Sequence, residues 1–211
     1  MSSQTTQGIR AQRKARRPAE ILDAAFEEFV AHGFSAARVE DIADRVGVTK
    51  GTIYVYFDSK ERLFRETVAH VLASIRLDIE ALADDLQGAS QTERIERFIR
   101  SAYTLLGQHE RRLTLIRLLI AEGPRFPHLL AWHQDHFLAR MIDLVRRFIA
   151  DGIASGEFRS SAIERFPEIL LSPVVMFSIS QLRSGQSWSD DLAAFVDAHV
   201  DLALHGLRAD P

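Results

Sequence analysis

Apolar side chains recur along this chain at intervals of three and four residues, which is the spacing of one face of an α-helix. The first stripe consists of Ile21, Leu22, Ala25, Phe26, Phe29 and Val30. Pro18 before it suits the first turn of a helix, and Gly33 after it favours a helix end. The pattern therefore predicts a helix between these two residues.

Comparable stripes continue to the C-terminus. They predict short helices near residues 39–46 and 49–57, and longer ones near 60–86, 92–109, 111–121, 137–156, 163–182 and 189–207. Asp58 or Ser59 can cap the helix near residue 60, and Asp58 with Glu61 has the spacing of a capping box. Pro173 predicts a kink or a late helix start. Because no segment has the pattern of a strand, we predict an all-α fold of about nine helices.

Composition narrows the class of protein. The 211 residues are 26% charged and 46% hydrophobic, enough for a sizeable core. The absence of cysteine excludes disulfides, thiolate zinc sites and a cysteine nucleophile. The apolar runs are too short to cross a bilayer, and the basic N-terminus leads into Pro18-Ala19-Glu20 instead of an apolar signal core. We therefore expect a soluble cytoplasmic protein with no membrane partner.

Charge is unevenly spread along the chain, although its net value is only −3. Residues 1–17 contain no acid and five basic residues, namely Arg10, Arg13, Lys14, Arg16 and Arg17. A mobile basic arm of this kind suits a polyanion bound at one end of the molecule. It is also compatible with a disordered, solubilising tail, and the arm alone leaves both interpretations open.

The two short helices joined by Gly47 and Val48 have the dimensions of a helix-turn-helix. Ala43 on the first helix is small enough for a close crossing, and Ile53 and Phe57 supply apolar contacts from the second. Gly47 can adopt a turn conformation that branched residues resist. Thr49 can cap the second helix.

The exposed face of the second helix would fit the major groove of DNA. Lys50 can reach a phosphate or guanine acceptors, and the lack of a side chain at Gly51 lets the backbone approach the duplex. Lys60 can share a phosphate with the amides that begin the next helix. The DNA-contact candidates are Arg38, Thr49, Lys50, Gly51, Thr52, Tyr54, Tyr56 and Lys60. The competing interpretation is a buried turn with two core tyrosines.

Across residues 16–68 the sequence strongly resembles the N-terminal domain of TetR/AcrR-family transcriptional regulators. The matching pieces are Ile21-Leu22-Asp23-Ala24-Ala25 with Phe29, Gly33-Phe34, Val39-Glu40-Asp41-Ile42-Ala43, Gly47-Val48-Thr49-Lys50-Gly51-Thr52-Ile53-Tyr54 and Tyr56-Phe57-Asp58-Ser59-Lys60-Glu61-Arg62-Leu63. The resemblance implies a homodimeric, all-helical repressor, or less often an activator, whose C-terminal domain binds a small molecule that alters DNA affinity. With the basic arm at 1–17, we therefore expect a DNA-binding domain at 18–62 and a ligand-binding and dimerisation domain at 63–211.

One departure from the family pattern lies before the first short helix. Members of the family usually have Thr-Ser or a similar pair there, whereas this chain has Ala37-Arg38. The usual hydroxyl cap and phosphate contact are therefore missing. Arg38 can replace the phosphate contact, or Ser35 can cap from further back.

The C-terminal part offers candidate ligand contacts of two kinds. Apolar, adaptable side chains that could line a pocket are Trp132, Phe137, Met141, Met176 and Phe177. Polar candidates are Arg117, Glu122, His128 and His133. His133 and His136 are three residues apart and with Glu122 could hold a metal, but the apolar neighbours argue against it. We expect no metal and no cofactor, and each aromatic residue could instead be core.

The resemblance also implies that the last two helices pair with their twofold copies. The candidate dimer residues are Phe177, Leu182, Leu192, Phe195, Val196, His199, Val200 and Leu204. The alternative is that these stripes are buried within the monomer.

Motifs for catalysis are missing or broken. Gly152-Ile153-Ala154-Ser155-Gly156 misses the G-x-S-x-G pattern by one position, and His109-Glu110 is followed by Leu113 where H-E-x-x-H needs histidine. We therefore expect no enzyme. The resemblance implies instead a repressor that binds a palindromic operator as a homodimer and is released by a small molecule. An architectural DNA-binding protein is the other alternative, although residues 63–211 are net acidic.

Overall fold

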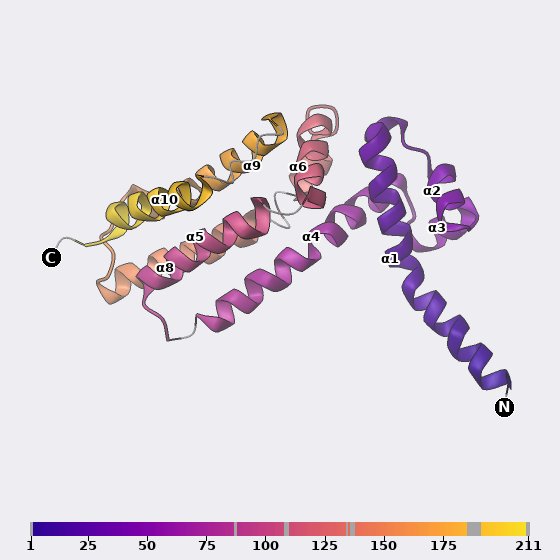
Figure 1. Ribbon diagram of the computed structural model, residues 1–211, viewed down its shortest axis with the longest axis horizontal. Helices are drawn as coiled ribbons and strands as arrows, with labels where there is room; N and C mark the ends of the chain where they lie inside the picture. Colours follow the sequence, from indigo (N-terminus) through magenta and orange to yellow (C-terminus); the bar gives the residue numbers. More distant parts are fainter. Residues whose placement is uncertain are drawn as a thin grey trace. The chain divides into compact units, whose positions relative to one another are not determined.

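The computed structural model describes residues 2–86, 88–107, 110–133, 135, 138–184 and 191–209 (Figure 1). The α-helices are α1 (Ser2–Ala36), α2 (Val39–Val46), α3 (Lys50–Tyr56), α4 (Lys60–Asp85), α5 (Gln91–Gly107), α6 (Glu110–Glu122), α7 (Pro127–His133), α8 (Ala139–Ser155), α9 (Ser172–Ser184) and α10 (Leu192–Leu207). Two 3₁₀ helices, η2 (Ala162–Glu164) and η3 (Pro167–Leu170), precede α9. No strand forms in these ranges, so the all-α prediction is confirmed.

The chain divides into two compact units that do not follow the expected domain boundaries. The first unit combines Met1–Ala73 with Leu118–Trp132, and the second combines Ser74–Arg117 with His133–Pro211. Helices α4 and α6 each contribute residues to both units. The segment 118–132, expected in the C-terminal domain, therefore belongs with the helix-turn-helix.

Helix α1 is longer than the sequence pattern predicted. It begins at Ser2 and contains Pro18 in its interior, so the predicted start at this proline is wrong. The arginine, lysine, glutamine and alanine residues before Pro18 are good helix formers, which accounts for the continuation. The helix is interrupted at Gly33, whose φ of 73° lies in the left-handed region.

The core of the first unit is rich in aromatic rings. Phe29, Phe34 and Phe64 are all buried, and their ring centroids lie 5.1 to 6.0 Å apart. Phe126, from the loop between α6 and α7, adds an edge-to-face contact with Phe34 at 4.7 Å. These contacts join the end of α1 to the start of α4 and to the loop that precedes α7.

Gly33 is favoured by its backbone conformation and lies against the side chain of Glu122. A β-carbon at this position would lie 2.5 Å from Oε1 of Glu122, far inside van der Waals contact. The other carboxylate oxygen of Glu122, Oε2, is buried and has no hydrogen-bond partner among the described residues. Glu122 was a candidate ligand contact, but the structure packs it against the turn that ends α1.

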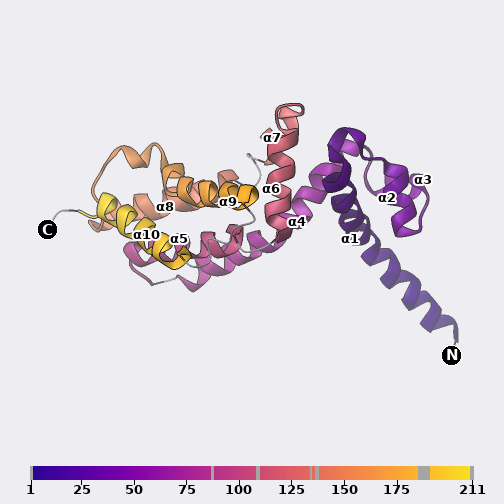
Figure 2. The same cartoon turned by 45° about the horizontal axis from the view of Figure 1, so that its top comes forward.

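In the second unit, α5 packs against α8, α9 and α10 (Figure 2). Their inward residues form one apolar core, with its centre at Phe98, Ile99, Tyr103, Val145, Ile149, Val174 and Leu207. Helix α9 begins at Ser172 with Pro173 in its first turn, as the late start predicted. The pattern missed the short helix α7.

Two contacts from the turn after α8 stabilise this unit. The carboxylate of Glu157 accepts hydrogen bonds from the backbone N–H groups of Gln91 and Thr92, both at 3.1 Å, and so caps α5. The ring of Phe158 occupies the space beside Gly152 where a β-carbon would lie. None of the described helices has the length and apolar character needed to span a membrane.

Candidate nucleic-acid interface

Helices α2 and α3 form the predicted helix-turn-helix. Gly47 ends α2 with φ 71° and ψ 42°, the left-handed conformation expected for it. The next residue, Val48, donates its backbone N–H to the Ala43 carbonyl at 2.9 Å. On the inner side, Ile42, Ala43 and Ile53 are buried, with at most 2% of each exposed. The turn is thus held by backbone bonds and by the small apolar contact that the sequence predicted.

Thr49 caps α3, as predicted. Its Oγ1 accepts the backbone N–H of Thr52 at 3.2 Å and lies 3.0 Å from the Thr52 hydroxyl. Because Ile53 and Phe57 on the other side of the helix are buried, the orientation of α3 about its own axis is fixed.

The outward side of α3 carries most of the residues that were predicted to contact DNA. Lys50, Gly51 and Tyr54 are exposed, while Thr52 and Tyr56 are half-buried. The interpretation of two core tyrosines is therefore wrong for Tyr54, 38% of which is exposed.

The sequence interpretation missed Val55, which is 81% exposed. Ile53 points into the core, and residues two positions away on a helix point roughly the opposite way. The burial of Ile53 therefore predicts outward directions for both Gly51 and Val55, and that signal could have identified the valine. An exposed aliphatic group here can contact a thymine methyl.

Lys50 is held at the surface by α2. Its Nζ donates to Oε1 of Glu40 at 2.6 Å and lies 5.8 Å from the centre of the Tyr54 ring. The hydrogen bond from Lys50 lowers the pKa of the Glu40 carboxyl, and the same bond raises the pKa of Lys50. Both side chains remain about half exposed, so solvent and other anions can reach the pair.

The missing hydroxyl cap of α2 is replaced from another helix. Arg38 occupies the cap position without a side-chain cap of its own. Its backbone N–H donates to Oε1 of Glu28, a buried carboxylate on α1, at 3.4 Å. The second oxygen of Glu28 lies 3.7 Å from a guanidinium nitrogen of Arg45. The side chain of Arg38 is exposed, and its phosphate contact stays a prediction.

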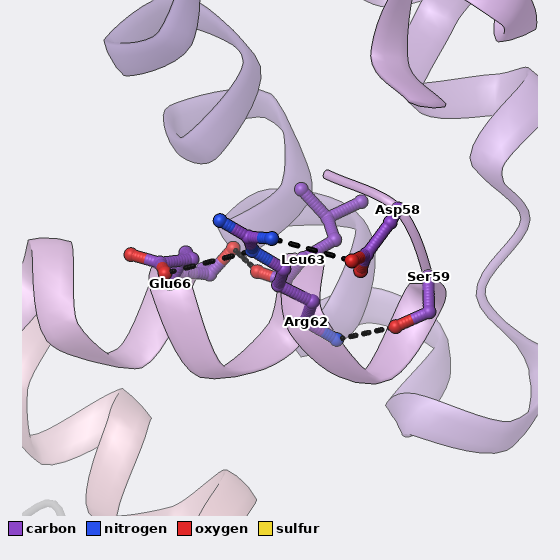
Figure 3. Close-up of polar contacts among 6 residues, drawn as sticks. Asp58, Ser59, Arg62, Leu63 and Glu66 are labelled. Atoms are coloured by element: carbon purple, nitrogen blue, oxygen red, sulfur yellow. Dashed lines mark hydrogen bonds and ion pairs between the residues drawn. The ribbon is translucent and has the colours of Figure 1, made fainter. Parts of the chain in front are cut away.

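The start of α4 is capped by Ser59 and not by the predicted Asp58–Glu61 box. Oγ of Ser59 accepts the backbone N–H of Arg62 at 3.1 Å (Figure 3). The Asp58 carboxylate instead pairs with the Arg62 side chain at 3.2 Å, and Glu66 lies 4.0 Å from the same guanidinium. Because α4 begins at Lys60, the residue directly before the helix is Ser59, and it takes the capping position that the box would have given to Asp58.

Lys60 has contacts that the sequence did not predict. Its ammonium donates to the Ser35 carbonyl at 3.0 Å and lies 5.2 Å from the centre of the Phe34 ring. Burial lowers the pKa of Lys60. The residue therefore connects the start of α4 to the end of α1, and its proposed phosphate contact stays a prediction.

The candidate ligand residues do not converge on one cavity of the described chain. Glu122, His128 and Trp132 belong to the first unit, whereas Arg117 belongs to the second and is exposed. Of the remaining second-unit candidates, Met141 and Phe177 are buried in the core and Met176 is 65% exposed. Phe137, His136 and the side chain of His133 lie outside the described residues, and so does the predicted histidine metal site.

The candidate dimer residues face the chain's own core. Those that are buried in the second unit are Phe177, Val196, His199, Val200 and Leu204. Leu192 and Phe195 pack partly buried against the same core, and the side chain of Leu182 lies outside the described residues. Their burial within one chain agrees with the alternative that the stripes are buried in the monomer, because helical periodicity identifies an apolar stripe but not the neighbour that covers it. Their place in a dimer interface stays a prediction.

His199 is fixed in this core by an aromatic partner. Its Nδ1 lies 2.9 Å from the hydroxyl oxygen of Tyr103. Burial lowers the pKa of His199 and raises the pKa of Tyr103 to about 12. Both groups are therefore neutral near pH 7.

Four large apolar side chains of the second unit are exposed. They are Ile169, Val175, Met176 and Leu202, which are between 42% and 73% exposed. Two of them, Ile169 and Leu202, line an open groove of about 500 Å³ between the η2–η3 segment and α10, together with Ile163, Leu170 and Ala203, among others. We call these residues together the α9–α10 outer face.

Comparison with known proteins gives two family matches that do not overlap. Residues 21–67 match the model for bacterial regulatory proteins of the tetR family. Residues 93–204, more than half of the chain, match the model for the C-terminal domain of AefR-like transcriptional repressors.

Individual relatives agree with these matches. The HTH-type transcriptional repressor SCO4008 of Streptomyces coelicolor is 32% identical over 133 residues, which is 61% of this chain and 62% of that protein. The HTH-type transcriptional repressor NicS of Pseudomonas putida is 28% identical over 95% of this chain and 97% of its own length. The fold is also similar to the crystal structure of the transcriptional regulator FadR from Bacillus subtilis in complex with stearoyl-CoA. The two structures superpose with a TM-score of 0.71 and are 21% identical in sequence, and the match covers 89% of this chain and 98% of that chain.

Proposed function

Because this chain belongs to the TetR family of transcriptional regulators, we propose that it is a repressor that binds a palindromic operator as a homodimer and is released by a small molecule. The observation that carries the proposal is the outward side of α3. It presents Lys50, Gly51, Tyr54 and Val55 to solvent, while Thr49 and the buried Ile53 fix the helix in place. A duplex can be contacted by this side with no rearrangement of the core.

The experiment that tests operator binding is selection of bound duplexes from a random pool, followed by sequencing. A twofold dimer contacts half-sites whose centres lie roughly 34–36 Å apart, or a multiple of that distance. The expected result is therefore an inverted repeat with half-sites one or more helical turns apart. Enrichment of no sequence would contradict operator recognition, and a single half-site would contradict the dimer.

Homodimerisation is proposed to use the α9–α10 outer face. Leu202 and Met176 are 73% and 65% exposed and lie on adjacent elements of the second unit. Exposed apolar patches of this kind mark interaction surfaces in soluble proteins. A second copy would bury Leu202 and cover the neighbouring groove.

Leu202→Glu tests this surface. A charge buried in a dimer interface without a partner is strongly unfavourable, so the variant should sediment as a monomer. Asp201→Lys is a control for charge at the neighbouring exposed position, which forms a local contact with His205. A Leu202→Glu variant that remains a dimer would move the interface elsewhere.

Release by an effector is supported by the shared helices. Both α4 and α6 have residues in the two units, so a ligand that shifts the second unit can shift the first through continuous helix. Couplings of this kind are typically worth about 1–3 kcal/mol, or roughly 5- to 150-fold in affinity.

Stearoyl-CoA is a rational first ligand because the Bacillus subtilis FadR structure contains it. A gel-shift titration against the selected duplex should show release if acyl-CoA thioesters are the effector class. Unchanged DNA binding would exclude stearoyl-CoA as the effector. It would not contradict the proposal that the protein binds an operator.

A further inference from the structure

The ammonium of Lys50 has an anionic partner before any DNA is present. Glu40 lies in the first turn of α2, and its Oε1 accepts from Lys50 Nζ at 2.6 Å. A phosphate oxygen would bind the same ammonium in the same way, because both are anionic acceptors for a charge-assisted hydrogen bond. The carboxylate of Glu40 therefore already engages one of the three donors of the Lys50 ammonium that a DNA phosphate could use.

We propose that Glu40 is an intramolecular competitor of the DNA backbone, which holds Lys50 until a phosphate displaces it and so weakens binding to every duplex. This inference rests on the proposed DNA-binding function. The exchange is feasible because both side chains are about half exposed, and such pairs open at little cost. The Tyr54 ring, 5.8 Å from Lys50 Nζ, gives the ammonium a second contact that does not depend on Glu40.

Displacement leaves Glu40 uncompensated beside the duplex. The unpaired carboxylate of Glu40 then repels the DNA phosphates. This repulsion partly cancels the attraction between Lys50 and the phosphate that it binds. Counterion release per neutralised phosphate sets the salt dependence of binding, with a slope of about −0.9 for each in a plot of log K against log salt concentration. Glu40 should therefore lower both the affinity and the steepness of that plot.

The test compares wild-type protein with Glu40→Gln, which keeps the size of the side chain and removes its charge. Binding to a fluorescein-labelled duplex of scrambled sequence is measured by anisotropy over a range of salt concentrations. We expect Glu40→Gln to bind about twofold to fivefold more tightly, as for loss of an exposed pair, with a slope steeper by up to about 0.9. Glu40→Ala is a second neutral variant, and thermal unfolding verifies that each variant is folded.

Two further comparisons separate the competitor role from simpler effects. Glu96→Gln removes an equally exposed carboxylate that pairs with Arg100 at 3.0 Å in the second unit, and it should leave affinity unchanged. In a Lys50→Ala background, Glu40→Gln should tighten binding less than it does in the wild-type protein, because only the direct repulsion between Glu40 and the phosphates is then relieved.

Three results would overturn the proposal. These are an unchanged or weaker affinity of both neutral variants, an equal gain from Glu96→Gln, or an equal gain with Lys50 already removed. If the wild-type protein binds neither the scrambled duplex nor the selected one, it is the proposed function that fails, and the two failures are thereby distinguished.

Discussion

The backbone N–H of Arg38 donates to the Glu28 carboxylate, so that a residue on α1 caps the first helix of the helix-turn-helix. The carboxylate is almost completely buried and also lies beside the Arg45 guanidinium. One side chain therefore satisfies a helix terminus and joins α1 to both ends of α2.

Replacement of Glu28 should destabilise the protein. Loss of a helix cap costs about 0.5–2 kcal/mol, and the substitution also leaves the partly buried N–H of Arg38 without its acceptor. We therefore expect Glu28→Ala to lower the free energy of unfolding by about 2 kcal/mol, measured by urea denaturation. Glu20→Gln, which removes an exposed partner of Arg17 on the same helix, should change it by less than about 0.5 kcal/mol. Equal midpoints for Glu28→Ala and wild type would contradict the capping role.

Tyr54→Ala should weaken operator binding without unfolding the protein. The side chain is on the outward side of α3 and partly exposed, so its removal leaves no cavity. A good side-chain contact with a base is worth about 1–3 kcal/mol, which corresponds to a loss of roughly 5- to 150-fold in affinity for the selected duplex. Circular dichroism and sedimentation should match wild type. If the variant instead unfolds, Tyr54 is a core residue.

Gly152→Ala should destabilise the second unit. Its new β-carbon would overlap the ring of Phe158, which is itself buried. Overpacking of this kind costs about 1–3 kcal/mol, and the thermal midpoint should fall accordingly. Gly206→Ala is the matched control, since Gly206 is also in a helix but has no atom within 4 Å of the position of the added carbon. That variant should be neutral or slightly stabilising because alanine is the better helix former. Similar thermal midpoints for Gly152→Ala and Gly206→Ala would show that the Phe158 ring moves aside to accept the added carbon.

Stability should depend on pH through Glu157. The hydrogen bonds from the backbone N–H groups of Gln91 and Thr92 lower its pKa below 4.5 in the folded protein. A group with a lowered folded pKa stabilises the protein fully above its unfolded pKa and loses that contribution as pH falls through the folded value. We expect Glu157→Gln to reduce the free energy of unfolding by about 1 kcal/mol at pH 7, and the difference from wild type to shrink toward pH 3. A difference that is constant with pH would mean that the carboxylate charge plays no part.

Local rules predicted the elements that depend on near neighbours in the chain. The Thr49 cap, the Gly47 turn and the buried Ile53 each follow from residue types within a few positions, and the structure confirms them. Glu28 was missed because it caps a helix from ten residues away. Glu40 was missed for the same reason, since its partner Lys50 is on the next helix.

The surroundings of the candidate dimer residues could not be predicted for a different physical reason. Helix α10 carries apolar residues on more than one side, with Val200 buried and Leu202 73% exposed. The periodicity of its apolar residues identified the larger stripe, but the α5 residues that cover it are far away in sequence. Leu202, which lies outside that stripe, is the residue on which the proposed dimer surface depends.

The contact of Phe126 with Phe34, together with the placement of Glu122 beside Gly33, has a practical consequence for protein engineering. A chimera that joins residues 1–73 of this chain to the sensor of another regulator would leave behind part of the packing that the N-terminal helices use. Such a graft should transfer its DNA specificity only when residues 118–132 are transplanted with it.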